Sequence, residues 1–144
     1  MSVVRRLDHV ALAVRDSVRA AAELGDRLGL QAVHREDLTQ PHVRLTYLDA
    51  GNGFIQLVEP LDEESEVARW LAEHGEGIHH VCFGVDDVAE AVAQIGGGPR
   101  PERLGSGRGR PSAFVPDLIC GMRVECTRFS QRDDVERSAG RLQD

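Results

Sequence analysis

The chain has 144 residues, of which 41% are hydrophobic and 28% are charged, a composition typical of one soluble globular domain. Its formal net charge is −7, and nucleic-acid binding is not expected because it requires a basic face. All 17 basic residues are arginines, so chemistry that needs a lysine, such as a Schiff base, is excluded. No apolar run is long enough to span a membrane and no signal-peptide pattern is present, so we expect a cytoplasmic protein.

The first half of the chain predicts one strand, one helix and three further strands. Residues 7–14 (LDHVALAV) have the β-branched and apolar content of a strand. Residues 17–28 predict a helix that begins behind Asp16 or Ser17 as an N-cap and ends at Gly29. Three strand-like runs follow, at residues 30–36, 42–49 and 53–60.

The second half repeats this pattern. Residues 78–85 (IHHVCFGV) match residues 7–14, and His80 falls on His9, 71 positions later. A helix is predicted over residues 87–95, and strands are predicted roughly at residues 99–105, 110–116 and 121–128. The glycine- and arginine-rich run at residues 105–111 predicts a mobile loop.

Between the halves, residues 62–75 predict a connector helix capped by Asp62, with an apolar stripe of Val67, Trp70 and Leu71. The predicted fold is α+β, with two βαβββ modules in one domain over residues 1–144. The predicted segments are module 1 at about 6–60, the connector at 62–75, module 2 at about 77–128 and a polar tail at 129–144.

The two matched histidines share a strand face with small residues. Because strand side chains alternate, His9 lies on the face of Ala11 and Ala13, and His80 lies on the face of Cys82 and Gly84. The opposite faces are bulky and apolar and should pack on the helices. The small-residue faces leave room that another group can fill.

The last strand of each half adds an oxygen donor. Gln56 follows His9 by 47 residues, and Glu125 follows His80 by 45 residues. Two imidazole nitrogens and two oxygens, related by a pseudo-two-fold axis, suit a divalent metal and leave two octahedral positions for water or substrate. Packing alone accounts for a single strand histidine, but two matched pairs favour a metal site.

These stretches resemble the vicinal oxygen chelate (glyoxalase/bleomycin resistance) superfamily and, within it, the methylmalonyl-CoA epimerases. LDHVALAV, GLQAVHRE, GMRVE and especially EPLDEESEVARWLAEHGEGIHH carry the resemblance. It implies an open mixed β-barrel, a homodimer, and His9, Gln56, His80 and Glu125 as ligands of a divalent ion (Co, Ni, Mn, Mg, Zn or Fe). The implied partner is a small acyl thioester, bound to CoA or to a carrier, or a related acid.

The implied reaction removes the α-proton of the chelated thioester through a metal-stabilised enolate and returns it to the other face. The family carries a glutamate as acid/base on the third strand, where this chain has Leu45; nearby His42 could substitute, or Glu125 could itself handle the proton. The family's HPK-like turn is replaced by residues 115–117 (VPD). Arg108 or Arg110 could contact phosphates of the substrate, and a solvated loop is the alternative.

Two other functions fit the same pattern. One is a different metal-dependent reaction of the superfamily, such as an isomerase, lyase, decarboxylase or oxygenase in a biosynthetic pathway. The other is a metal-free binding or resistance protein, although such proteins line their cavity with aromatic residues and this chain has only 4%.

Overall fold

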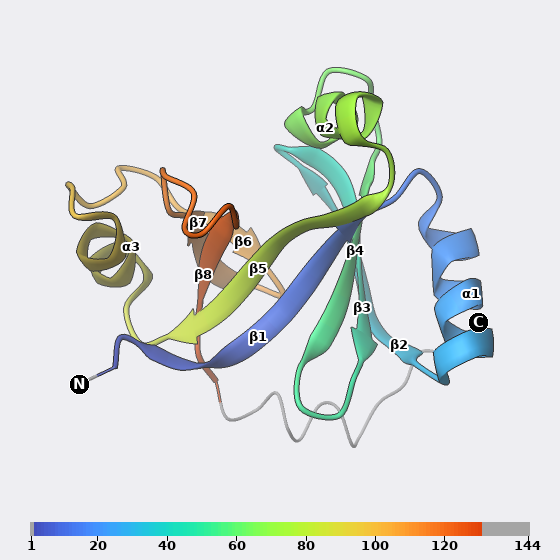
Figure 1. The fold of residues 1–144 in the computed structure, drawn as a ribbon, viewed down its shortest axis with the longest axis horizontal. Helices are drawn as coiled ribbons and strands as arrows, with labels where there is room; N and C mark the ends of the chain where they lie inside the picture. The colour runs from blue at the N-terminus through green and yellow to red at the C-terminus, as the bar shows by residue number, and fades with distance from the viewer. Residues whose placement is uncertain (1, 131–144) are drawn as a thin grey trace. The chain divides into compact units, whose positions relative to one another are not determined.

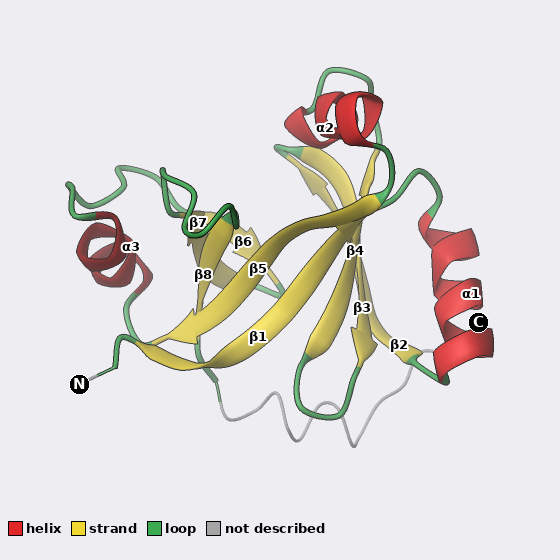
Figure 2. Cartoon of the chain, viewed as in Figure 1, coloured by secondary structure: helices red, strands yellow, loops and turns green. Residues whose placement is uncertain are grey.

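The structure is a computed structural model that describes residues 2–130 (Figures 1 and 2). The first repeat comprises β1 (Val4–Ala13), α1 (Ser17–Leu28), β2 (Gln31–Thr39), β3 (His42–Asp49) and β4 (Phe54–Pro60). The connector helix is α2 (Glu66–His74). The second repeat comprises β5 (Gly77–Val85), α3 (Val88–Gly96), β6 (Gly105–Gly107), β7 (Arg110–Phe114) and β8 (Val124–Arg128). The predicted α+β class and the two βαβββ repeats are confirmed.

The described chain divides into two compact units that do not coincide with the two repeats. One unit contains residues 2–9 and 80–130, and the other contains residues 10–79. The boundaries therefore cut β1 after His9 and β5 before His80. The predicted module limits, near residues 60 and 77, stay a prediction.

In the unit of residues 10–79, β3 lies between β2 and β4, and both pairings are antiparallel. Leu12 and Val14 of the first strand and its following turn pack in a cluster with Leu24 of α1, as predicted for the bulky face. The small-residue face is filled by an apolar cluster, hereafter the small-face cluster. Its buried members are Ala11, Ala13, Val43, Leu45, Tyr47, Phe54, Val58, Val67 and Leu71.

In the unit of residues 2–9 and 80–130, β8 pairs in parallel with β5 and antiparallel with β7. The parallel register places Cys82 opposite Glu125, so these two side chains lie on the same face. The opposite face packs on α3 through residues that include Val85, Val92 and Val124. The bulky face of the second repeat therefore also packs on its helix.

The helices of the two repeats begin in the same way. The Asp16 carboxylate accepts a hydrogen bond from the Arg19 backbone N–H at 3.1 Å, and α1 follows. The Asp87 carboxylate accepts one from the Glu90 backbone N–H at 3.0 Å, and α3 follows. Each aspartate satisfies an N–H that has no partner within its own helix. The repeat therefore extends beyond the strands to the helix caps.

The connector helix begins later than predicted. The predicted cap, Asp62, instead accepts hydrogen bonds from the backbone N–H groups of Glu64 and Ser65, both at 3.0 Å, in the turn before the helix. The N-cap is Ser65, whose hydroxyl accepts from the Ala68 N–H at 3.1 Å. The prediction of Asp62 as the cap was wrong because aspartate also favours turns, and the turn comes first here.

The glycine- and arginine-rich segment is a hairpin, so the prediction of a mobile loop at residues 105–111 was wrong. β6 pairs antiparallel with β7, with Gly107 opposite Arg110. The turn residues Arg108 and Gly109 have φ of 55° and 71°, the left-handed values that a two-residue hairpin turn needs. The strand predicted at residues 99–105 is placed too early: β6 begins only at Gly105, since Pro99 and Pro101 cannot donate to a ladder. Residues 131–144 of the predicted tail lie outside the described residues.

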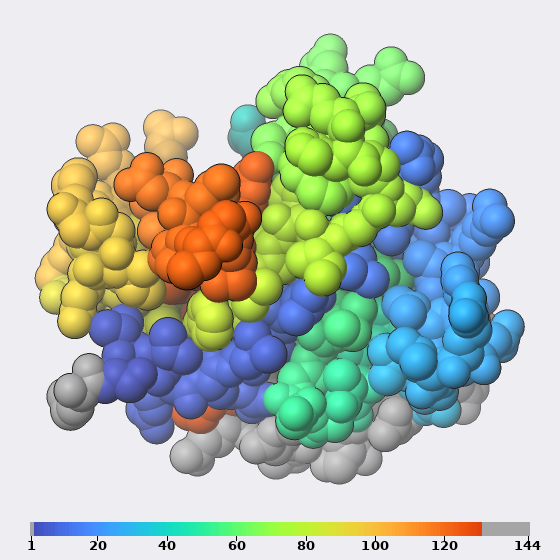
Figure 3. Space-filling view, in the orientation of Figure 1, coloured from blue at the N-terminus to red at the C-terminus, as the bar shows by residue number. Residues whose placement is uncertain are grey.

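The segment between β7 and β8, orange in Figure 3, lies on the surface. It carries an exposed leucine, Leu118, and an exposed thiol, Cys120.

Among the helices of residues 2–130, none combines the length and the apolar character needed to cross a membrane.

Candidate metal centre

Three side chains with metal-ligating atoms converge in the unit of residues 2–9 and 80–130. His9 comes from β1, His80 from β5 and Glu125 from β8. The Nε2 atoms of His9 and His80 lie 3.3 Å and 3.2 Å from the same Glu125 oxygen, Oε1. One potential ligand atom from each residue lies within 4.8 Å of the others. The ligating atoms of two strand histidines and one carboxylate, which are far apart in the sequence, thus lie close together in the structure.

The two imidazole rings are close to perpendicular. Their centroids are 5.5 Å apart and the planes meet at 72°. His9 and His80 are 3% and 5% exposed, and the Glu125 side chain is 13% exposed. The cluster is therefore shielded from bulk water but not fully closed at Glu125.

The electrostatics of the cluster favour an ionised Glu125. Burial would raise the pKa of Glu125, but the contacts with the imidazoles of His80 and His9 lower it well below its usual range. Burial would lower the pKa of His9, but its hydrogen bond to Asp8 and its contact with Glu125 raise it overall. Burial dominates at His80 and lowers its pKa. The two histidines thus differ, and His9 carries a proton more readily.

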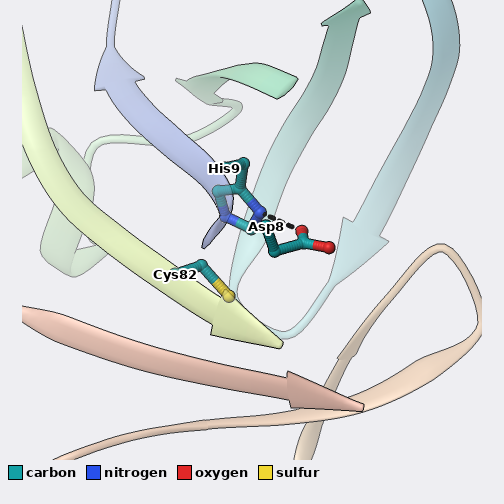
Figure 4. A group of neighbouring side chains, drawn as sticks. All are labelled: Asp8, His9 and Cys82. Carbon is teal, nitrogen blue, oxygen red and sulfur yellow. Dashed lines mark hydrogen bonds and ion pairs between the residues drawn. The ribbon is translucent and has the colours of Figure 1, made fainter. Parts of the chain in front are cut away.

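Asp8 is part of this cluster, although the sequence did not single it out. Its side chain is 1% exposed, and its Oδ2 lies 2.7 Å from Nδ1 of His9 (Figure 4). The Arg108 guanidinium donates to the same Oδ2 at 2.5 Å. Burial would raise the pKa of Asp8, but His9 and Arg108 lower it overall. The Asp-His dipeptide was the available signal, but adjacent strand residues normally point to opposite faces.

Cys82 is the other neighbour that the sequence missed as a site residue. Its sulfur lies within 4.8 Å of ligating atoms of both Asp8 and His9 (Figure 4). Burial raises the pKa of the Cys82 thiol well above its usual value, and the charges of Glu125 and Asp8 add to this. In the metal-free protein the thiol is therefore neutral near pH 7.

Gln56, the fourth predicted ligand, lies in the unit of residues 10–79. Its side chain is 4% exposed, and its Nε2 donates a hydrogen bond to the Tyr47 hydroxyl at 2.8 Å. Its Oε1 has no hydrogen-bond partner in the described part of the chain. An amide oxygen buried without a partner is costly, which suits an oxygen that binds a ligand. Its place in a ligand set stays a prediction.

The remaining predicted site residues have other surroundings. Leu45 is buried in the small-face cluster, opposite Val58 on β4. His42 is half exposed, and its Nδ1 lies 3.3 Å from a carboxylate oxygen of Asp62. The Arg108 side chain is 7% exposed against Asp8, and Arg110 is also buried. The predicted contact of Arg108 or Arg110 with a substrate phosphate stays a prediction.

The donor set fits a divalent first-row ion. Two imidazole nitrogens and a carboxylate oxygen are ligands that such ions accept, and a three-residue set leaves positions for water or substrate. The Nε2 atoms of His9 and His80 both lie close to one oxygen of Glu125. A divalent cation bound there can take the place of the protons that these nitrogens share with the carboxylate. The same donor set serves several ions, so it does not select one.

The sequence of residues 8–96 matches the model of the glyoxalase/bleomycin resistance protein/dioxygenase superfamily. The chain belongs to this superfamily. It is 33% identical over 132 residues to an ethylmalonyl-CoA/methylmalonyl-CoA epimerase of Cereibacter sphaeroides, a match that covers 85% of this chain and 97% of that relative.

Solved structures of methylmalonyl-CoA epimerases have a similar fold. The methylmalonyl-CoA epimerase of Mycobacterium tuberculosis superposes with a TM-score of 0.81 at 28% identity, covering 94% of this chain and 95% of that one. A glutamate-to-glutamine variant of the Streptomyces coelicolor methylmalonyl-CoA epimerase, in complex with 2-nitronate-propionyl-CoA, gives 0.78 at 30% identity, covering 88% and 99%. The predicted resemblance to the vicinal oxygen chelate superfamily and to its methylmalonyl-CoA epimerases is confirmed.

Proposed function

We propose that this chain is a metal-dependent epimerase that inverts the α-carbon of a 2-substituted malonyl thioester. The observation that carries the proposal is the convergence of His9 and His80 on one buried oxygen of Glu125. The similarity to methylmalonyl-CoA epimerases supports the reaction class, and the Streptomyces coelicolor complex supports an acyl-CoA substrate. Methylmalonyl-CoA is therefore the first substrate to test.

His9, His80 and Glu125 are the residues that would hold the divalent ion. The ion would supply Lewis acidity towards the carboxylate and thioester oxygens of the substrate. The two histidines contribute neutral nitrogen donors, and Glu125 contributes one negative charge, so the ligand set leaves the site with net positive charge. Such a site favours an anionic substrate.

The proton transfer needs an acceptor and a donor on opposite faces of the α-carbon. We propose Glu125 as one of them: the α-carbon–hydrogen bond breaks, the proton passes to the carboxylate, and the electron pair of that bond is delocalised onto the thioester carbonyl oxygen. The lowered pKa of Glu125 makes it a weak base, so we expect slow exchange if it acts alone. Leu45 cannot serve as the second group, because its side chain cannot carry a proton.

The test is proton NMR of (2R)- and (2S)-methylmalonyl-CoA in deuterated water, with the cobalt-loaded protein. We expect the α-hydrogen to exchange for deuterium and each epimer to yield the other. Protein treated with EDTA and the variant Glu125→Gln should both lose the exchange. Glu102→Gln, which changes an exposed carboxylate, is the matched control and should retain it. Absence of exchange with a metal-loaded protein would overturn the epimerase proposal.

A second candidate is a one-base reaction at the same metal site, such as a decarboxylation or an isomerisation. Leu45 favours it, because it is buried in the small-face cluster and a leucine side chain at this position cannot carry a proton. The same NMR experiment separates the two candidates. Exchange of the α-hydrogen without inversion supports the one-base reaction, and exchange with inversion supports the epimerase.

A further inference from the structure

Asp8 and His9 are consecutive residues of β1, yet their side chains meet. The Asp8 Oδ2 lies 2.7 Å from Nδ1 of His9, and the Asp8 side chain is 1% exposed (Figure 4). An ionised carboxylate can only accept hydrogen bonds, so Nδ1 of His9 must be the donor. Nε2 of His9 is then the nitrogen that faces Glu125, at 3.3 Å from its Oε1. The contact with Asp8 fixes both the tautomer and the orientation of His9.

Arg108 in turn holds Asp8. Its guanidinium donates to the same Oδ2 at 2.5 Å and is 7% exposed. Arg108 occupies the left-handed region, with φ of 55°, which is unfavourable for a residue other than glycine. The ion pair with Asp8 offsets this cost and the cost of burying the guanidinium. A chain that needed only a tight turn here would be better served by a second glycine beside Gly109.

The hairpin formed by β6 and β7 contacts the other histidine as well. The Phe114 ring of β7 lies edge-on to the His80 ring, with centroids 4.9 Å apart and planes at 84°. The turn of the hairpin thus reaches His9 through Arg108 and Asp8, and its second strand touches His80 directly. The rotamers of both histidines are constrained from one structural element.

We infer that Asp8 and Arg108 are positioning residues of the metal centre: Arg108 holds the Asp8 carboxylate, and Asp8 holds the N–H of His9 so that Nε2 is presented as the ligand. This inference rests on the proposed metal-dependent function. Groups that hold the distal nitrogen of a ligating histidine typically contribute about 10–100-fold to metal affinity. The pair also balances charge, because Arg108 neutralises Asp8 and leaves Glu125 as the net negative ligand.

The test measures cobalt affinity and the tautomer of His9 in parallel. Cobalt is titrated in competition with a chromophoric chelator, and metal-free protein with ¹⁵N-labelled histidine is observed by NMR. Asp8→Asn should weaken cobalt binding by about 10–100-fold and shift the ¹⁵N signals of His9 away from the Nδ1–H form. The exposed Arg103→Gln, in the same unit, is the control and should change neither reading.

Arg108→Gly separates positioning from folding. Glycine suits the positive φ of this turn, so the hairpin keeps its backbone while the ion pair with Asp8 is lost. We expect weaker cobalt binding in this variant, by up to about 10-fold, without loss of the folded NMR spectrum. This variant also carries the test if Asp8→Asn fails to fold.

The outcomes are distinct. If the unmodified protein binds no cobalt, the proposed function fails and the positioning role fails with it. If the unmodified protein binds cobalt and Asp8→Asn and Arg108→Gly bind it equally tightly, the positioning role alone is overturned. Weaker binding in both variants, with a changed His9 tautomer in Asp8→Asn, supports the inference.

Discussion

The last strands of the two repeats, β4 and β8, carry Gln56 and Glu125 at matched positions in different surroundings. Glu125 contacts two imidazoles and is buried as a charged group. Gln56 is neutral, donates to the Tyr47 hydroxyl, and lies on a strand whose neighbours Phe54 and Val58 belong to the small-face cluster. Both repeats therefore carry a side chain with an oxygen donor at this position, but only the side chain of Glu125 is charged.

The difference shows what each environment can support. A buried carboxylate requires positively polarised partners, and the second repeat provides them through His80 and, with the first strand, His9. A buried amide needs only hydrogen-bond partners, and the apolar cluster offers Gln56 a single hydroxyl. We expect the two repeats to respond differently to substitution at these positions and alike at their helix caps.

The largest expected effect is at Glu125. Glu125→Gln keeps the shape but removes the charge, and a first-row divalent ion held by His9, His80 and Glu125 then loses the anionic ligand of that set. We expect cobalt affinity to fall by at least about 100-fold, more than for loss of a supporting residue. Isothermal titration calorimetry with cobalt measures it, and Glu102→Gln is the control. If Glu125→Gln binds cobalt as tightly as the unmodified protein, the charge of Glu125 does not distinguish the two repeats in metal binding.

The next effect is on stability at low pH in the metal-free protein. The pKa of Glu125 lies well below its ordinary value of 4.5, so its contribution to folding is present above about pH 4.5 and is lost as the pH falls. Asp8, whose pKa is also lowered, acts in the same direction. Thermal unfolding between pH 7 and 3 in EDTA should show a steeper loss for the unmodified protein than for Glu125→Gln. If both proteins lose thermal stability equally steeply as the pH falls, the lowered pKa of Glu125 does not contribute to stability as proposed.

A smaller effect is expected at Gln56. The repeat predicts this residue as a fourth ligand, and a neutral amide oxygen attracts a cation less than a carboxylate does. Gln56→Ala should weaken cobalt binding by roughly 10-fold, about 1.4 kcal/mol. Tyr47→Phe is the matched control, because it removes the hydroxyl next to Gln56 and leaves the amide oxygen in place. If Gln56→Ala and Tyr47→Phe bind cobalt alike, the predicted ligand role is wrong.

The smallest effect, and an equal one in both repeats, is expected at the helix caps. Asp16→Ala and Asp87→Ala each remove one side-chain acceptor from a helix start. Each should reduce the free energy of unfolding by about 1 kcal/mol. Urea denaturation followed by circular dichroism measures both. A clear loss in one variant and none in the other would show that the repeats do not share this feature.

Much of the fold follows from local sequence signals. The start of α1 behind Asp16 or Ser17 and its end at Gly29 could be predicted because aspartate, serine and glycine have specific roles at helix termini. The cap of the connector helix could not, since Asp62 and Ser65 both suit a cap and only the folded turn decides between them. The β6–β7 hairpin could not be predicted either, because its glycine-rich sequence lacks the apolar alternation of most strands.

The convergence of His9, His80 and Glu125 could be predicted because the internal repeat relates positions far apart in the sequence. The supporting contacts of Asp8 and Arg108 could not. Arg108 is 100 residues from Asp8, and no repeat relates the two. Alternation along a strand also predicts that Asp8 lies on the face away from His9, whereas the two side chains meet in the structure.

The division of β1 after His9 has a practical consequence for anyone who cuts or extends the gene. The first residues of the chain are a component of the unit that otherwise starts at residue 80. There Arg5 pairs with Asp86 at 2.9 Å and lies 4.9 Å above the Phe129 ring. A fragment that begins after the connector helix therefore lacks both these contacts and His9. A truncation that removes His9 also removes a member of the histidine cluster, and the second half of the gene does not encode its own unit in full.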